Sequence, residues 1–287
     1  AARLVALACL LAAPGAGTLA DAPRPNVVFI LADDLGRAEV GVYGQTKIRT
    51  PSIDRIAAEG MRFTRFYAGS PVCAPSRCTL LTGKHSGHGF VRDNREIQPE
   101  GQAPLPASEV TLGERFQAQG YTTVAIGKWG LGFPGSEGDP LDQGFDHFFG
   151  YNCQRHAHNH YPTYLWKDRE RVELKGNTGG ATGEQHSHDL FEAEALAFLR
   201  NRGDKPFFLF LPFTIPHVAL QVPDDSLAEY DGAFEETPYV KGRGYQPHPK
   251  PRAAYAAMVT RMDRTVGRIL ATLREEGIDD DTIVVFS

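Results

Sequence analysis

The stretch NVVFILADD, residues 26–34, joins a run of β-branched and aromatic residues to two carboxylates at its end. Such a run is typical of a buried strand, and amphipathic segments separate it from others of its kind. The predicted strands are 26–32, 61–67, 121–126, 207–211 and 282–286. This alternation predicts an α/β fold with a mixed, mostly parallel sheet flanked by helices.

Capping residues and apolar periodicity predict the helices. The first covers 51–59, with Thr50 as N-cap. Two others begin with capping boxes: one at Thr111 with Glu114, and one at Asp189 with Glu192 that reaches about residue 202. The longest covers 252–276. The last carries apolar residues at a spacing that faces a core. Turn residues dominate 134–188 and 221–251, which we expect to be long loops that carry binding surface.

Composition and charge indicate a globular chain whose overall charge does not favour polyanionic partners. The 287 residues are 41% hydrophobic and 23% charged, and the formal net charge is −5. This charge gives no overall attraction to nucleic acid, so any anion site must be local. The cysteines Cys9, Cys73, Cys78 and Cys153 are too few for a disulfide framework, so the fold must rest on its core.

Residues 1–22 are predicted to be part of a signal peptide. Arg3 precedes an apolar run over 4–13, and cleavage after Ala20 or Ala22 fits the small residues there. The run is far shorter than the ~20 residues that a membrane-spanning helix needs. We expect export without a stable membrane anchor, to the periplasm or outside the cell, or to the lysosome if the source is a eukaryote.

Asp33 and Asp34 directly follow the first predicted strand. Ligand sites of parallel sheets gather beyond the carboxyl ends of strands, and adjacent carboxylates there supply the hard oxygen ligands that Ca²⁺ or Mg²⁺ prefers. An acidic turn after a strand also serves as a helix cap or a solvated loop, so the pair alone does not decide between these readings.

Cys73 opens the run Cys-Ala-Pro-Ser-Arg, with Leu80 and Gly83 at fixed offsets. Pro75 suits the first turn of a helix that reaches about residue 82, and Arg77 lies one turn after the cysteine on the same face. A lone cysteine is usually a small buried hydrophobe. This run, however, resembles the signature of type I sulfatases of the alkaline phosphatase superfamily, whose cysteine is oxidised to formylglycine by a formylglycine-generating enzyme.

Three further segments resemble sulfatases, in the family's order. Residues 32–36 are similar to the first metal-ligand segment, and residues 127–132 to a segment whose lysine, Lys128 in this sequence, contacts the sulfate and the nucleophile. His217, after the strand predicted at 207–211, resembles the substrate-contacting histidine. Many relatives carry a histidine where this chain has Gly130, so the group that helps release sulfate here is not identified by the sequence.

The resemblance implies an alkaline-phosphatase-like sandwich and a sulfuric ester hydrolase. Its metal ligands would be Asp33, Asp34 and Cys73, holding Ca²⁺ or, alternatively, Mg²⁺. Arg77 and Lys128 would stabilise negative charge. One hydroxyl of the hydrated formylglycine would attack sulfur, and the second would allow sulfate to be expelled afterwards.

Histidines gather in one predicted loop among aromatic residues. They are His147, His156, His158 and His160. A zinc site, a sugar subsite and a solvated loop are all compatible with this composition, although the spacing suits zinc poorly. Because aromatic faces stack on sugar rings and imidazoles bind hydroxyls or sulfate, we name His156 and His158 as candidate substrate contacts.

Two other functions stay open. A phosphonate monoester or phosphodiester hydrolase shares the same motif, and a non-catalytic relative that binds sulfated glycans is the third reading. In sulfatases the strand matching 282–286 is followed by further metal ligands and a smaller C-terminal domain. We therefore expect residues 23–287 to be a truncated catalytic domain, without that smaller domain and inactive by itself.

Overall fold

The computed structural model describes residues 24–98, 101–240 and 245–287, so the predicted signal peptide and Cys9 lie outside the described residues. The strands are β1 (Asn26–Asp33), β2 (Thr122–Lys128), β3 (His147–Tyr151), β4 (Tyr164–Lys167), β5 (Glu170–Glu173), β6 (Phe207–Pro216) and β7 (Thr282–Phe286). The helices are α1 (Pro51–Glu59), α2 (Cys73–Thr82), α3 (Leu112–Ala118), α4 (Ser187–Arg200), α5 (Asp224–Ala228) and α6 (Pro251–Glu275). Short 3₁₀ turns are η2 (Arg37–Glu39), η3 (Gly41–Tyr43) and η4 (His156–His158).

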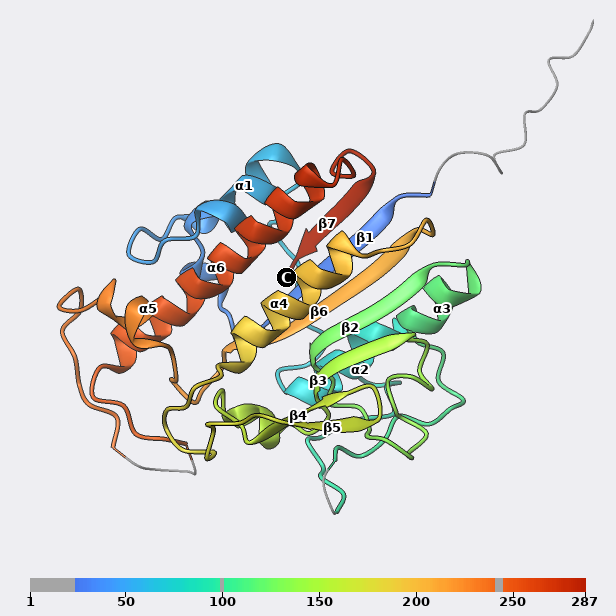
Figure 1. Ribbon diagram of the computed structural model, residues 1–287, viewed down its shortest axis with the longest axis horizontal. Coiled ribbons are helices and arrows are strands. Elements are labelled where there is room, and N and C mark those ends of the chain that lie inside the picture. Colours follow the sequence, from blue (N-terminus) through green and yellow to red (C-terminus); the bar gives the residue numbers. More distant parts are fainter. Residues whose placement is uncertain (1–23, 99–100, 241–244) are drawn as a thin grey trace, which may run out of the picture.

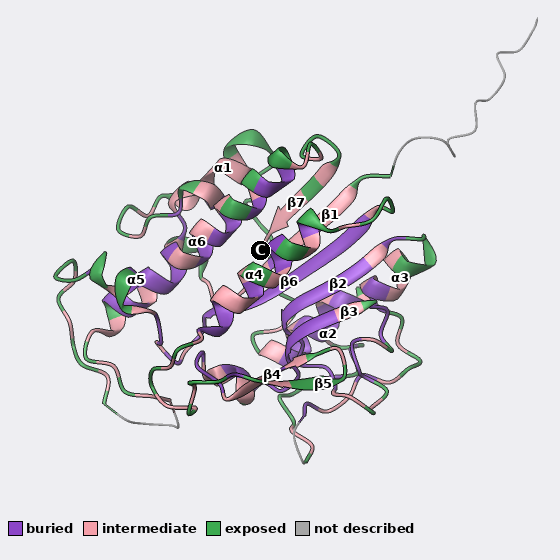
Figure 2. Cartoon of the chain, viewed as in Figure 1, coloured by how far each residue is buried: buried purple, intermediate pink, exposed green. Residues whose placement is uncertain are grey.

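The seven strands form one sheet in the order β5-β4-β3-β2-β6-β1-β7 (Figure 1). The neighbouring pairs β3–β2, β2–β6, β6–β1 and β1–β7 are parallel. The pairs β3–β4 and β4–β5 are antiparallel. The predicted α/β fold with a mixed, mostly parallel sheet is therefore confirmed. All ten residues of β6 are buried, as a strand covered on both faces requires (Figure 2).

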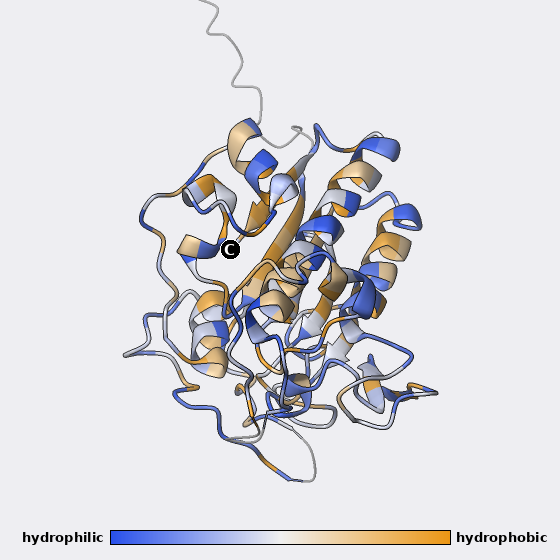
Figure 3. Ribbon diagram, turned by 90° about the vertical axis from the view of Figure 1, so that its left-hand side faces the viewer, coloured by the Kyte–Doolittle hydropathy of each residue, from blue (hydrophilic) through white to orange (hydrophobic). Residues whose placement is uncertain are grey.

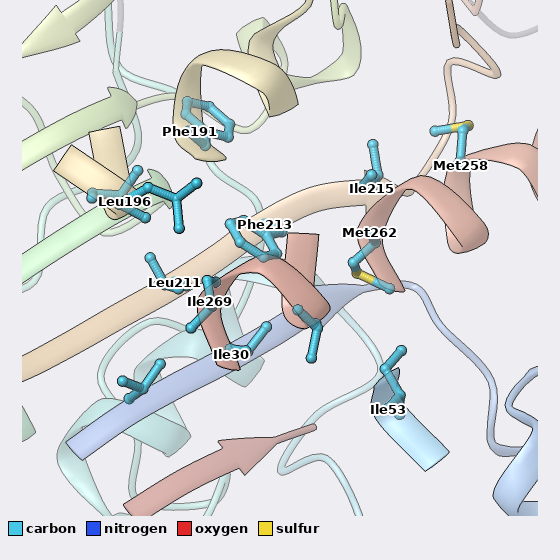
Figure 4. Close-up of a cluster of buried hydrophobic side chains, with 14 of the residues drawn as sticks. Ile30, Ile53, Phe191, Leu196, Leu211, Phe213, Ile215, Met258, Met262 and Ile269 are labelled. Carbon is cyan, nitrogen blue, oxygen red and sulfur yellow. The ribbon is translucent and has the colours of Figure 1, made fainter. Parts of the chain in front are cut away.

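Helices cover both faces of the sheet. On one face α1, α4 and α6 pack over the central strands, and the cluster there includes Ile30, Phe213, Met262 and Ile269 (Figure 4). On the other face α2 contributes its buried residues to a second cluster rich in aromatic rings, which includes Trp129. Apolar residues accordingly concentrate along the strands and the inner faces of the helices (Figure 3).

Local signals predicted several elements to within one or two residues. The Thr111 hydroxyl accepts a hydrogen bond from the backbone N–H of Glu114, and the Glu114 carboxylate accepts one from the backbone N–H of Thr111, so this capping box is confirmed. Thr50 precedes α1 as predicted, but its side chain does not cap the helix. Asp263 of α6 does so instead, because its carboxylate accepts from the N–H groups of Ser52 and Ile53.

Other predictions were wrong. The segment 61–67 is not a strand: it pairs with no strand of the described residues, and Met61 and Tyr67 are 76% and 81% exposed. The stretch 134–188 is not one loop, because β3, β4 and β5 lie in it and extend the sheet. Asp189 does not start its helix, which begins at residue 187; its carboxylate instead pairs with Arg261.

Candidate active site

Three neighbouring strands end at the same edge of the sheet and carry the predicted polar residues. Asp33 is the last residue of β1, Lys128 is the last of β2, and His217 follows β6 directly. Because β6 lies between β1 and β2, these side chains meet although up to 184 positions separate them in sequence numbering. The predicted residues thus lie together at the carboxyl ends of these strands, where ligand sites of parallel sheets usually form.

Asp33 is held between two cations. Lys128, with a fully buried side chain, donates from Nζ to Asp33 Oδ2 at 2.6 Å, and Arg77 NH2 lies 3.3 Å from Oδ1. Burial raises the pKa of Asp33, but the charges of Lys128, Arg77 and His217 outweigh it and lower this pKa to about 2. Asp33 is therefore an ionised carboxylate at neutral pH.

Helix α2 places Cys73 at its first residue, and Arg77 follows one turn later. Ala74 N donates to Asn94 Oδ1 at 2.9 Å, which fixes the start of the helix. The Cys73 side chain is half-buried at the amino end, where free N–H groups favour negative charge. Burial raises the pKa of Cys73, but a hydrogen bond with His217 and the charge of Lys128 give it a net lowering.

His217 connects the nucleophile candidate to the second carboxylate. Its Nε2 lies 3.4 Å from Asp34 Oδ2, and its Nδ1 contacts the carbonyl oxygen of Val218. Burial lowers the pKa of His217, but its hydrogen bond with Cys73 and the charge of Asp33 raise it overall. The protonated imidazole is therefore favoured more than in an ordinary histidine.

Among the described residues, one group has enough ligand atoms close together to hold a metal ion. Oxygen, sulfur and nitrogen atoms of Asp33, Cys73 and His217 lie within 4.8 Å of one another. The predicted ligand Asp34 is outside this group but reaches it through His217, and its side chain is 64% exposed. The carboxylates of Asp33 and Asp34 suit a hard cation, whereas the thiol of Cys73 does not. An oxygen in place of this sulfur would give three side chains with oxygen ligands.

The two predicted substrate contacts occupy different surroundings. The ring of His158 stacks on that of His217, with centroids 4.7 Å apart and planes 12° apart. Burial, and then the charges of Lys128 and His217, lower the pKa of His158 to about 4, so it is neutral at pH 7. His156 packs against the rings of Tyr151 and Tyr164, and its role stays a prediction.

Among the described residues, the group with ligand atoms close enough to hold a metal ion is the one around Cys73, and it does not include His147, His156, His158 or His160. His147 instead lies between Asp168 and Glu194, at 2.8 and 2.9 Å. His160 is fully buried, and its Nε2 lies 3.1 Å from the carbonyl oxygen of His217, so it supports the backbone of the site.

Sequence reasoning missed several residues of the site, which lie in segments without a recognisable motif. The ring of Tyr245 lies 5.3 Å from that of His158 and 6.2 Å from that of His217. Gln154 lies against Gly130, where a side chain would otherwise extend. Aromatic or amide residues in long loops carry no spacing signal, so only the fold brings them to the site.

No helix within the described ranges combines the length and the apolar character needed to cross a bilayer.

Comparisons with known proteins agree with this site. A sequence model of the family described as Sulfatase matches residues 25–287. The N-acetylgalactosamine-6-sulfatase of Canis lupus familiaris is 31% identical over 98% of this chain and 53% of its own length. The arylsulfatase of Klebsiella aerogenes is 30% identical over 99% of this chain and 70% of its own. The chain thus spans 53% and 70% of the length of these two relatives.

Solved structures share the fold. Ps i-CgsB, in complex with k-i-k-neocarrahexaose, superposes with a TM-score of 0.77 at 27% identity, covering 92% of this chain and 58% of that one. A phosphonate monoester hydrolase of Agrobacterium radiobacter has a TM-score of 0.63 at 20% identity, over 92% of this chain and 62% of that one, and so shares the fold alone. From its matching family model and its relatives, this chain belongs to the sulfatase family.

Proposed function

We propose that the protein hydrolyses sulfate esters, with the side chain at position 73 as nucleophile after its conversion to formylglycine. The observation that carries this proposal is the convergence of Asp33, Cys73, Arg77, Lys128 and His217 at one edge of the sheet. Its family membership supports the same conclusion. The hydrated aldehyde would supply one hydroxyl to attack sulfur and a second whose deprotonation releases sulfate.

Arg77 and Lys128 bind and stabilise the oxyanion in this proposal. Both side chains are almost completely buried, so their charges act in a region of low dielectric constant. Among the described residues, Asp33 is the carboxylate that pairs with both of them. A sulfate group entering the site meets two cations whose positions are already fixed, which is the arrangement that favours charge developing in a transition state.

Asp33 and Asp34 would hold a divalent cation, Ca²⁺ or alternatively Mg²⁺, together with the oxidised side chain of residue 73. The cation would supply Lewis acid chemistry at the sulfate oxygens. The low pKa of Asp33 supports this assignment, because a ligand carboxylate must be ionised. The change from a thiol to an oxygen ligand also matches the preference of such cations.

His217 would donate a proton to the ester oxygen that leaves as an alcohol. Its hydrogen bond with Cys73 keeps it next to the reacting position, and its raised pKa favours the protonated form. This role requires the protonated imidazole before the reaction and the neutral one after it.

The substrate class that we propose is a sulfated carbohydrate. Relatives are named N-acetylgalactosamine-6-sulfatase, and a neighbour in structure was solved with an oligosaccharide. His158 and Tyr245 line the side of His217 with aromatic rings, which suit the apolar faces of a sugar. We also propose that the protein is exported from the cytoplasm and that residues 23–287 form a catalytic domain.

The test uses the full-length protein that carries this chain, produced together with a formylglycine-generating enzyme. Hydrolysis of 4-nitrophenyl sulfate is compared with that of an aryl phosphonate ester, in calcium and in a chelator. Peptide mass analysis reports the conversion of Cys73, and Cys73→Ala is the control. Calcium-dependent sulfate release that the control abolishes is expected. Preference for the phosphonate, or converted protein without turnover that still binds sulfated glycans, would refute the proposal.

A further inference from the structure

Arg77 and the neighbouring Gln154 both carry buried polar atoms without partners. Within the described residues, Arg77 Nε and both side-chain polar atoms of Gln154 make no hydrogen bond, and the same holds for the side chain of Asn152. Asn152 is fully buried and Gln154 is 2% exposed. Folded proteins pair the great majority of such atoms, so the unpaired atoms of two adjacent side chains require an explanation.

The side chains of the residues on both sides of Gln154 contact the same carboxylate. Cys153 Sγ lies 3.7 Å from Glu96 Oε1, and Arg155 Nε lies 3.1 Å from the same oxygen. The main chain of Gly130 also donates to the carbonyl oxygen of Asn152 at 3.2 Å. The position of Gln154 is therefore set by contacts that do not involve its own carboxamide.

The carboxamide of Gln154 fills the space that a side chain at position 130 would take. A Cβ built on Gly130 would lie 1.9 Å from Gln154 Nε2 and 3.4 Å from Arg77 Cδ. Gly130 also has a φ of +76°, a conformation that glycine adopts without strain. The carboxamide of Gln154 and the stem of Arg77 therefore flank the same small volume.

The guanidinium of Arg77 is fixed at two of its three nitrogens. NH1 donates to the carbonyl oxygen of Lys128 at 2.6 Å, and NH2 faces Asp33 at the longer distance of 3.3 Å. Nε has no acceptor in the described structure, although the carboxamide of Gln154, which flanks the same volume, has an unpaired carbonyl oxygen. A half-turn of the carboxamide exchanges its oxygen and nitrogen, which occupy nearly the same volume.

We propose that Gln154 is a positioning residue, whose carboxamide oxygen accepts a hydrogen bond from Arg77 Nε when Arg77 binds the oxyanion of the substrate. This inference rests on the proposed function. Gln154 does not contact the reacting atoms in this proposal. Its carboxamide holds the plane of the Arg77 guanidinium while NH2 turns from Asp33 to the substrate. Gly130 is then required because any side chain there would displace the carboxamide.

A purely packing role leads to a different expectation. Methionine has nearly the same length and volume as glutamine but no strong hydrogen-bonding group. If Gln154 only fills space, Gln154→Met removes two unpaired buried polar atoms and leaves a protein that is equally stable or more so, and equally active. If Gln154 positions Arg77, the same variant keeps its stability and loses catalysis.

The experiment compares the unsubstituted full-length protein with Gln154→Met and with Gln143→Met as matched control. Gln143 is 1% exposed and also has an unpaired buried Oε1, but its amide nitrogen donates to the carbonyl oxygen of Glu137, outside the site. Melting temperature, converted Cys73, and kcat and KM for 4-nitrophenyl sulfate are measured for each. We expect Gln154→Met to lower kcat at least tenfold, to change KM less than threefold and not to lower the melting temperature. Gln143→Met should keep kcat within twofold of the unsubstituted protein.

The possible failures are distinguishable. If the unsubstituted protein releases no sulfate although Cys73 is converted, the proposed function is refuted and the role of Gln154 with it. If the unsubstituted protein is active and Gln154→Met stays within twofold in kcat, only the positioning role is refuted. A tenfold loss of kcat that Gln143→Met reproduces would likewise assign the effect to general packing and overturn the inference.

Discussion

Replacing Lys128 by methionine removes the positive charge that lies nearest to Asp33. The substitution keeps a long apolar side chain in a fully buried position but leaves the carboxylate of Asp33 with Arg77 as its remaining close cation, at 3.3 Å. Removing one partner from a buried ion pair costs about 3–5 kcal/mol. Because Arg77 still neutralises part of the charge, we expect the free energy of unfolding at pH 7 to fall by about 3 kcal/mol.

The pH dependence of this loss has a defined sign. The pKa of Asp33 is about 2 in the folded protein, against a reference value of 3.8. Its contribution to stability is therefore complete above pH 3.8 and is lost as the pH falls through 2. Between pH 7 and pH 3, the difference in unfolding free energy between the unsubstituted protein and Lys128→Met should shrink by about 1 kcal/mol.

Urea unfolding followed by circular dichroism measures both quantities, in a chelator so that the charges alone are compared. Lys167→Met is the control, because the Lys167–Glu194 pair at 2.9 Å is partly exposed and should contribute less than about 1 kcal/mol. A loss below about 1 kcal/mol for Lys128→Met, or a difference that stays constant down to pH 3, would refute the assignment of Asp33 and Lys128 as a strongly coupled buried pair.

The remaining predictions concern a glycine, a histidine, a carboxylate and a helix cap. Gly130→Ala should lower kcat at least tenfold, because its Cβ would lie 1.9 Å from Gln154 Nε2. Gly135→Ala is the control and should keep kcat, because Gly135 has a similar φ of +84° but open space around its Cβ. Equal losses in the two variants would assign the effect to backbone strain. Burial holds the pKa of His188 well below 6.5, so lowering the pH from 7 to 5.5 should reduce the free energy of unfolding by about 1 kcal/mol through this residue alone, and His188→Asn should remove that share of the pH dependence measured by urea unfolding; an unchanged pH profile contradicts this. Asp34→Asn should weaken the rise in melting temperature on adding calcium, which an equal rise would disprove. Thr111→Ala should destabilise the protein by about 1 kcal/mol through loss of its capping box, detectable as a lower urea midpoint.

The sequence predicted those features that depend on neighbouring residues or on a fixed motif. The start of α3 depends on Thr111 and Glu114, which are three positions apart, and the amino end of α2 carries the cysteine motif. The strands β1, β2, β6 and β7 were recognisable from their apolar, β-branched and aromatic runs, and β6 is buried along its whole length. The predicted Asp33, Cys73, Arg77, Lys128 and His217 indeed lie together.

Features that depend on distant partners could not be predicted. Asp189 has the spacing of a helix cap, but Arg261 of α6 binds its carboxylate. The five residues of β3 form a strand because β2 pairs with them in register, from Val124 with His147 to Lys128 with Tyr151. Segment 61–67 has the composition of a strand, but no strand among the described residues pairs with it. Gln154 lies beside Arg77 because the fold brings Gly130, 24 positions earlier, against its carboxamide.

The sheet also separates the reaction from the choice of substrate. Asp33, Lys128 and His217 are spaced by the width of adjacent strands, about 4.8 Å per step, and not by the length of the chain between them. The connections that leave this edge include the segments with His158 and Tyr245, which flank the site. Insertions and deletions in these connections would alter the shape of the entrance without changing the distances between the charged groups. A lineage built on this scaffold can therefore acquire new substrates by changing loop length, while one catalytic arrangement is inherited intact.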